Sequence, residues 1–181
     1  MISITPRPCK IGSSINTRTE KHGDEDVPAC DVPVAGITLD KGELNALLGE
    51  QYAHQLLFSI REGHTSPVFG MLEPFRLKGK IEDVQVSIKL GLLDGADEIE
   101  LTSAKLKGLT LEPQAGGLTL LGCKVQVSGD HVPSIAGTLL NFLNRVVTIE
   151  LHGGDATTSK AEKQQDLPIN TFGDGEQQDA A

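Results

Sequence analysis

The sequence predicts a β-rich α+β fold: a mainly antiparallel sheet, barrel or sandwich-like, with two packed helices and a disordered acidic C-terminal tail. Over residues 84–151, apolar side chains alternate with polar ones in several short runs, which is the period of a half-buried strand. Two other segments repeat their apolar residues at helical spacing, and beyond residue 152 the apolar pattern stops. We therefore expect one globular domain over residues 1–152 and a flexible acidic tail over residues 153–181.

The N-terminal part is expected to be extended. Residues 2–4 form a first strand, and the polar stretch that follows ends in a charged loop over residues 21–26. Residues 27–39 are again extended, but Pro28 and Pro33 lack the amide hydrogen that a central strand donates, so we place them at a sheet edge or a bulge.

Two helices are predicted. Asp40 followed by Glu43 is the pattern of a capping box, and Leu44, Leu47 and Tyr52 begin a helical repeat that runs through residue 58. An irregular connection over residues 61–75 follows. The second helix spans residues 133–144, with Pro133 near its first turn.

The strands of the second half are expected to pair in sequence. Asp94-Gly95 and residues 114–117 are typical turn sequences. Between Leu120 and Leu121 the apolar alternation slips by one residue beside Gly122, which predicts a β-bulge. Residues 146–151 then close the sheet.

Charge separates the body from the tail. The chain has 181 residues and a net charge of −9. Residues 1–150 carry 14 basic and 19 acidic side chains, whereas residues 151–181 carry 2 and 6, so the tail is the more acidic part per residue. This balance excludes a simple basic nucleic-acid binder of the histone kind. An aromatic content of 3% is also low for a protein that stacks bases on aromatic rings.

The three cysteines, Cys9, Cys30 and Cys123, have unrelated spacings and are expected to be free thiols. We expect no signal peptide and no membrane span, because no apolar run approaches 18 residues. Together these features predict a soluble protein of a reducing, intracellular compartment.

The chain carries no catalytic motif, and we expect no enzyme activity, no cofactor and no metal site. His22, Asp24, Asp26, Cys30 and Asp31 offer ligand types, as do His152 and Asp155, but neither group has a zinc spacing or a calcium-loop pattern. Cys123 alternates with valines and should be buried, which makes it a poor nucleophile. His54 is expected at the surface or at its boundary.

Basic residues recur at strand spacing on the face opposite the apolar one. If the strands pair in sequence, one outer face of the sheet collects Arg76, Lys78, Lys80, Lys89, Lys105, Lys107 and Lys124. Such a row could follow a phosphate backbone. The alternative is an ordinary solvated face whose charges also protect strand edges from aggregation.

One apolar island lies within the acidic tail: Leu167, Pro168, Ile169 and Phe172. A short apolar element in a flexible acidic segment is suited to binding a partner protein, and an acidic segment can compete with nucleic acid for a basic groove. Plain solubilising disorder is the alternative.

Two stretches of the chain are similar to a family of small proteins encoded by tailed phages and prophages. They are the run from Thr17 to Val34, TRTEKHGDEDVPACDVPV, and the strand-rich region that holds Ala104-Lys-Leu-Lys-Gly-Leu, Gly116-Gly117 and Val125-Gln-Val. The likeness covers most of residues 15–151. It implies the cytoplasm of a bacterial host and assigns no catalytic residues.

Three functions fit these observations. The first is a non-enzymatic phage accessory protein of DNA metabolism, which binds single-stranded DNA through the lysines and partner proteins through the tail. The second is an inhibitor of a host defence system or nuclease, whose acidic surface mimics nucleic acid. The third is a virion or tail-assembly component, which would form a homo-oligomer.

Overall fold

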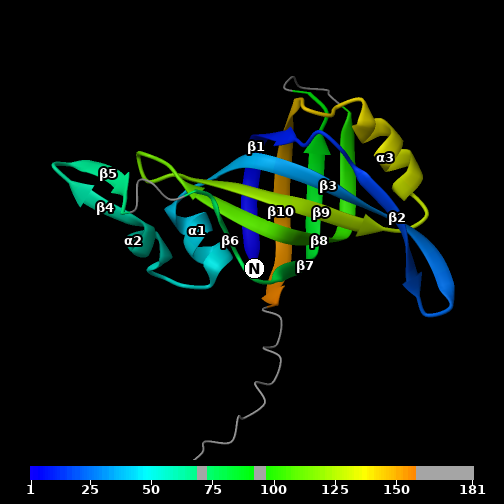
Figure 1. Ribbon diagram of the computed structural model, residues 1–181, viewed down its shortest axis with the longest axis horizontal. Coiled ribbons are helices and arrows are strands. Elements are labelled where there is room, and N and C mark those ends of the chain that lie inside the picture. The colour runs from blue at the N-terminus through cyan, green and yellow to red at the C-terminus, as the bar shows by residue number, and fades with distance from the viewer. Residues whose placement is uncertain (69–72, 92–96, 158–181) are drawn as a thin grey trace, which may run out of the picture.

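The computed structural model describes residues 1–68, 73–91 and 97–157, with side chains up to Gly154. The chain forms a closed, six-stranded antiparallel barrel from which two hairpins project (Figure 1). The β-rich α+β class is therefore confirmed, and the barrel is the form that the sheet takes. Both the Asp94-Gly95 turn and the tail beyond residue 157 lie outside the described residues.

Six strands form the barrel wall in the order β1-β10-β7-β8-β9-β3, and β3 returns to β1 through Lys10–Ala35 and Ile11–Val34. Their bounds are β1 Ile2–Ile11, β3 Glu25–Leu39, β7 Lys80–Lys89, β8 Glu98–Pro113, β9 Thr119–Ser128 and β10 Val146–Thr157. Every neighbouring pair is antiparallel. Closure matters because it joins β1 and β3, the two strands that would otherwise be the outer edges of the wall, at two pairs of residues.

The barrel interior is filled with aliphatic side chains. Alternate residues of each strand point inward, and the largest fully buried ones include Ile4, Ile37, Ile88, Leu106 and Ile149. Because side chains alternate between the two faces of a strand, burying one set fixes the other set on the outside.

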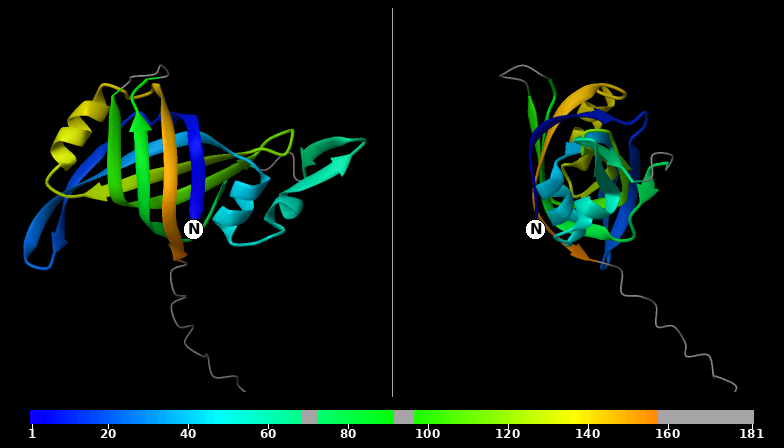
Figure 2. Two further views of the ribbon diagram at one scale, coloured as in Figure 1. Left: turned by 180° about the vertical axis from the view of Figure 1, so that it is seen from behind. Right: turned by 90° about the vertical axis from the view of Figure 1, so that its left-hand side faces the viewer.

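In the part of the chain that the structure describes, three helices lie at the two ends of the barrel (Figure 2). At one end are α1, Lys41–Leu48, and α2, Ala53–Leu57, and at the other is α3, Val132–Leu140. Leu44 and Leu47 of α1, and Leu139 of α3, are buried against the core. Each amphipathic helix therefore covers an end of the barrel that would otherwise expose core side chains to water.

The capping box is confirmed, but the long first helix is wrong. Asp40 accepts from the Glu43 amide at 2.9 Å, and the Glu43 carboxylate accepts from the Asp40 amide at 2.9 Å. The helix ends at Gly49, whose φ of 65° is the left-handed conformation that glycine adopts without strain. The helical spacing of apolar residues continues past Gly49 to Tyr52 and Leu56, so the spacing alone predicts a helix longer than α1.

Two segments predicted as loops are hairpins. The polar stretch before residue 27 forms β2, Asn16–His22, which pairs with β3 from Asp31 back to Glu25. The second hairpin consists of β4, Phe58–Arg61, which starts at the last residue of the predicted helix, and β5, His64–Pro67, which lies in the connection expected over residues 61–75. A short strand, β6, Phe75–Arg76, then pairs with β8. Neither hairpin has a buried face to produce apolar alternation, which is why the sequence did not reveal them.

The predicted bulge lies in the neighbouring strands rather than in β9. Thr119, Leu121, Cys123 and Val125 of β9 are buried in strict alternation. The register instead shifts in β8 between Lys107 and Thr110, and in β3 between Val34 and Ile37. Gly108 and Gly36 adopt positive φ at these two places.

Pro33 lies where β3 changes partner from β2 to β1. Its carbonyl oxygen accepts a hydrogen bond from the Gly12 amide at 2.8 Å. The ring nitrogen of Pro33 faces the same side of the strand, between the two ladders, so the missing amide hydrogen leaves no ladder bond unmade.

The second predicted helix is α3, and it begins as predicted, with Pro133 in its first turn, but it ends at Leu140. The last strand extends to Thr157, five residues beyond the expected domain boundary.

Candidate nucleic-acid interface

Three lysines form one row across three adjacent strands, which we call the lysine row: Lys80, Lys107 and Lys124. Lys80 of β7 lies opposite Lys107 of β8, and Lys107 lies opposite Lys124 of β9. Directly opposed residues of an antiparallel pair have Cα atoms about 5 Å apart, so the row is about 10 Å long. The strands do pair in sequence here, as the proposed outer face required.

The barrel core fixes the outward direction of these side chains. Lys80 precedes the buried Ile81, and Lys124 lies between the buried Cys123 and Val125. Lys107 follows the buried Leu106, and the bulge at Gly108 comes directly after it. A shift of register by one residue would bury the lysines, so the packing that stabilises the barrel also maintains the row.

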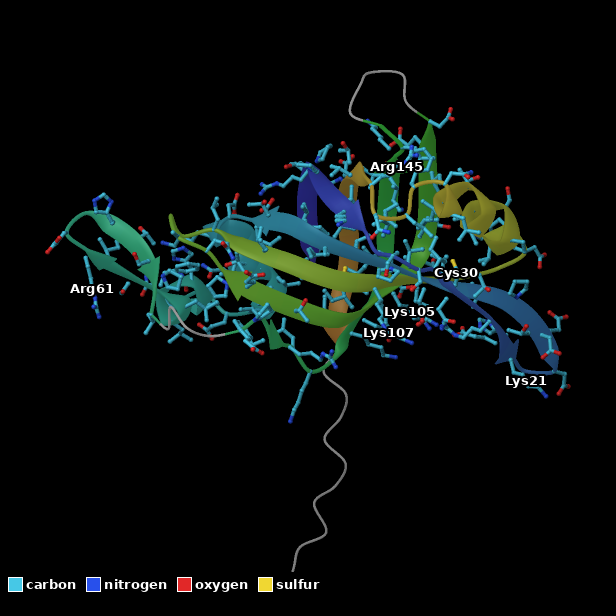
Figure 3. The ribbon with its side chains drawn as sticks, turned by 45° about the horizontal axis from the view of Figure 1, so that its top comes forward. Lys21, Cys30, Arg61, Lys105, Lys107 and Arg145 are labelled. Carbon is cyan, nitrogen blue, oxygen red and sulfur yellow. The ribbon has the colours of Figure 1, made fainter. Side chains whose placement is uncertain are left out.

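Lys105 lies two residues before Lys107 on the same outer face and is placed opposite Gln126 of β9. Figure 3 shows Lys105 and Lys107 next to each other near the base of the β2–β3 hairpin, whereas Arg61 lies on the hairpin at the other end of the molecule. Arg76 and Lys78 are exposed just before Lys80 along the chain, and Arg76 is opposite Thr110. The structure thus brings six of the seven proposed basic residues to one region.

Lys89 does not belong to this group. It is nine residues from Lys80 along β7, which corresponds to about 30 Å at the usual strand rise. Its neighbour on β8 is Glu98, so it forms an opposite-charge pair across the strands. Sequence spacing alone could not separate Lys89 from the others.

The Glu82 carboxylate lies between Lys80 of the row and the neighbouring Lys105. Glu82 is 2.9 Å from the Lys80 ammonium group and 3.6 Å from that of Lys105. The hydrogen bond from Lys80 lowers the pKa of the Glu82 carboxyl, with smaller contributions from both lysine charges. Within the described residues, Lys107 and Lys124 have no carboxylate within ion-pair distance.

Beside the row, the outer face carries a network of polar side chains from β2, β3 and β9. Arg18 forms ion pairs with Glu20 at 2.6 Å and with Asp31 at 2.7 Å. The buried Gln126 donates from its amide nitrogen to Glu20. The bond from Arg18 lowers the pKa of Glu20, and the charges of Lys107 and Lys105 act in the same direction. This network holds the base of the β2–β3 hairpin against the barrel next to the lysines.

No described aromatic side chain lies on the lysine row. Phe58 is buried, Phe75 and Phe142 pack against the core, and Tyr52 is exposed at the α1–α2 end of the barrel. Base stacking is therefore not available to the row from these residues. The described residues of the row can bind phosphates, and none of them can stack on a base.

The opposite part of the outer face is acidic, which the predictions from the sequence did not include. A shallow groove of about 270 Å³ is lined by Glu98, Glu100, Glu150, His152, Ser87 and Gln85. His152 lies 2.6 Å from the Glu150 carboxylate, and its other ring nitrogen is 3.3 Å from the Ser3 hydroxyl. The alternation of Glu98 with Glu100, and of Glu150 with His152, was the available signal.

The chain of Ser3, His152 and Glu150 has the residue types of a hydrolytic triad but not its surroundings. Ser3 is exposed in β1 and lies opposite His152 in the ladder between β1 and β10. In a ladder the backbone amides are engaged between strands, whereas a hydrolase directs free amides at the oxyanion. We therefore assign no catalysis to these residues.

The residues considered as metal ligands are scattered. Cys30 is buried inside the barrel, and Asp31 is engaged by Arg18 on the outside, whereas His22, Asp24 and Asp26 lie near the exposed tip of the β2–β3 hairpin. In the part of the chain that the structure describes, no three metal-ligating side chains gather in one place. The side chain of Asp155 lies outside that part.

The three cysteines are free, as the sequence predicted, and all three are buried, which was predicted only for Cys123. Burial raises the pKa of the Cys9 thiol to about 12, and burial raises the pKa of the Cys123 thiol to about 12 as well. These thiols act as small core side chains rather than as nucleophiles.

Exposed apolar side chains gather around the β4–β5 hairpin and α2: Tyr52, Leu56, Ile60, Val68 and Leu118. His54 stacks on Phe58, and its ring lies 3.0 Å from the Gly117 carbonyl, so it connects α2 to the turn between β8 and β9.

The proposed partner-binding residues lie outside the described residues: Leu167, Pro168, Ile169 and Phe172.

Among the described residues, no helix has both the length and the apolar character that crossing a membrane requires.

Comparison with known proteins finds no family model, no curated protein and no solved structure that matches this chain. The resemblance to phage-encoded proteins accordingly stays a prediction, and the functional argument rests on the geometry of the outer face.

Proposed function

We propose that this protein is an accessory protein of DNA metabolism that binds a single strand of nucleic acid by its phosphates, using the lysine row together with Lys105, Arg76 and Lys78. The contacts are electrostatic and independent of base sequence. The proposal requires no chemical step on the nucleic acid.

The observation that carries the proposal is the placement of like charges directly opposite one another. Opposed like charges in a sheet destabilise it, by roughly 0.2–1 kcal/mol a pair. Lys107 faces a lysine on both sides, whereas Lys89 in the same sheet faces Glu98. If the face were adapted only to solvent, we would expect every opposed pair of charges to have opposite signs, as Lys89 and Glu98 do. A polyanion that neutralises Lys107 and Lys124, which have no ion-pair partner among the described residues, explains why the first arrangement is retained.

The shape of the surface favours a single strand over a duplex. The row is only about 10 Å long and lies on the curved wall of a barrel. The neighbouring β2–β3 hairpin carries Asp24, Glu25 and Asp26 at its tip, and these would be repelled by the second strand of a duplex. A single strand can follow the lysines without passing the hairpin tip.

The binding assay compares two double variants with the same change of charge. A fluorescently labelled 20-nucleotide oligothymidylate is titrated with the full chain at ~50 mM salt. Phosphate contacts from Lys107, Lys124, Arg76 and Lys78, the four proposed residues that Glu82 does not engage, predict a Kd of about 10–100 µM. Lys107→Gln with Lys124→Gln should weaken binding about tenfold or more. Lys10→Gln with Lys89→Gln is the control, since Lys10 lies on β1 and Lys89 at the far end of β7.

Two results would overturn the proposal: no binding of the oligonucleotide at ~50 mM salt, or an equal loss of affinity in both double variants. If light scattering then shows a large closed assembly, the role of a virion or tail-assembly component replaces the present one. A labelled duplex of the same length tests the preference for a single strand, and tighter binding of the duplex would contradict it.

A further inference from the structure

The chain leaves the barrel beside the lysine row. The last described pairing of β10 places Thr157 opposite Lys80, the first residue of the row. Thr157, the residue that precedes residues 158–181, therefore lies about 5 Å from Lys80, measured between Cα atoms.

The segment that starts there has the opposite charge. Residues 158–181 contain five acidic and two basic side chains. Both basic residues, Lys160 and Lys163, come early, and from residue 164 onward the segment holds four carboxylates and no basic side chain: Asp166, Asp174, Glu176 and Asp179. The acidic part is thus separated from the strand end by a short connection of six residues.

That connection is long enough for the acids to reach the lysines. Asp166 is nine residues from Thr157, and nine residues span at most about 30 Å. The row is about 10 Å long, so carboxylates from residue 166 onward can be placed over Lys107 and Lys124. Because both groups belong to one chain, their effective concentration is in the millimolar range.

Two other parts of the described outer face are less favourable for this segment than Lys107 and Lys124. The groove beside β10 presents Glu98, Glu100 and Glu150, which repel an acidic chain. Arg18 is already engaged by Glu20 and Asp31. Lys107 and Lys124 are exposed and, among the described residues, have no carboxylate at ion-pair distance.

We propose that residues 164–181 bind the lysine row of their own chain and compete there with nucleic acid. The competition rests on the function proposed above, whereas the contact within the chain does not. Carboxylates would take the places of phosphates at Lys107 and Lys124, and nucleic acid would have to displace them in order to bind. The segment would act as a built-in competitor that sets the affinity of the surface.

The contact is tested first without nucleic acid. A carbodiimide that joins amines to carboxylates in direct contact is applied to the full chain at ~50 mM salt, and the cross-linked peptides of the monomer band are identified by mass spectrometry. Links from Lys107 or Lys124 to Asp174, Glu176 or Asp179 are expected, and they should be absent at ~500 mM salt. Absence of these links at low salt, or their occurrence only in cross-linked dimers, would overturn the contact within one chain.

The competition is tested on the full chain by removing charge from the segment. Asp174→Asn, Glu176→Gln and Asp179→Asn together should tighten binding of the labelled oligothymidylate about three- to tenfold at ~50 mM salt. Glu50→Gln, Glu62→Gln and Glu73→Gln make the same change of charge at exposed positions near the α1–α2 end and should change affinity less than twofold.

The outcomes separate the two proposals. Cross-links without any binding of the oligonucleotide would contradict the proposed function and leave the contact standing. Binding that is equal in the wild type and in both triple variants would overturn the competition and leave the proposed function standing.

Discussion

At the scale of single residues, like charges lie directly opposite one another on one part of this protein's surface. Lys107 has a lysine opposite it on each side, although Glu82 partly offsets the charge of Lys80 and Lys105. The candidate residues could be predicted from the sequence, because lysine alternated with buried residues. Which of these lysines lie together could not be predicted, because their positions depend on the register between strands. The sequence does not show that the register shifts at Gly108.

A single charge reversal should therefore increase stability while it weakens binding. Lys124→Glu converts its pair with Lys107 from a like pair to an opposite pair, and we expect the free energy of unfolding to rise by about 0.5–1 kcal/mol. The affinity for the oligothymidylate should fall about tenfold. Urea unfolding at low salt measures the first effect, and a loss of stability would show that the row is not strained by repulsion.

The buried thiols predict slow chemistry and a defined dependence on pH. With a pKa of about 12, only about one Cys9 or Cys123 side chain in ten thousand is a thiolate at pH 8. Ellman's reagent should label fewer than one cysteine per native chain within minutes and all three in urea. Rapid labelling of the native chain would place at least one thiol outside the core.

The same shift affects stability at alkaline pH. A folded pKa above the unfolded value of 9.0 means that the unfolded thiols lose their protons first, so the stabilisation is present below pH 9 and is lost as pH rises toward 12. The free energy of unfolding should fall between pH 9 and pH 11, and the fall should be smaller in Cys123→Ala. An equal fall in both chains would assign the effect to other groups.

At the scale of the elements, the capping box was predicted correctly because it has a local physical cause. The first helix was predicted too long because its apolar spacing does not show where the helix ends. The capping box at Asp40 forms as expected, but the helix ends at Gly49 instead of continuing to residue 58. Hairpins without a buried face, such as β2–β3 near its tip, leave no apolar alternation and were interpreted as loops. Barrel closure depends on the pairing of β1 with both β10 and β3, which are remote in sequence.

The capping box should contribute measurably to stability. Asp40→Ala removes the acceptor for the Glu43 amide and should lower the free energy of unfolding by about 1 kcal/mol. Arg7 of β1 binds Glu43 at 2.9 Å and lies 3.8 Å from Asp40, so the cap also joins α1 to the barrel. Lys41→Ala, at the exposed first residue of the helix, is the matched control and should change stability by less than 0.5 kcal/mol. Equal effects in the two variants would contradict the role of the cap.

At the scale of the whole molecule, a closed barrel separates two surfaces of opposite character. The core fixes which side chains point outward, and the register then places the lysine row at one end of β7 and the acidic groove toward the other. The net charge of −9 hides this separation, since the groove, the hairpin tip and residues 158–181 together hold eleven of the 25 acidic side chains. A polyanion can therefore approach the lysine row although the protein as a whole is acidic.

The salt dependence of binding tests the central claim most directly, because it counts the phosphates that the surface neutralises. For four contacts with a single strand, the logarithm of the binding constant should fall with the logarithm of the salt concentration at a slope of about −2.8. The slope should weaken to about −1.4 in Lys107→Gln with Lys124→Gln and stay unchanged in Lys10→Gln with Lys89→Gln. A slope that both double variants leave unchanged, or binding that does not depend on salt, would contradict phosphate binding at the lysine row.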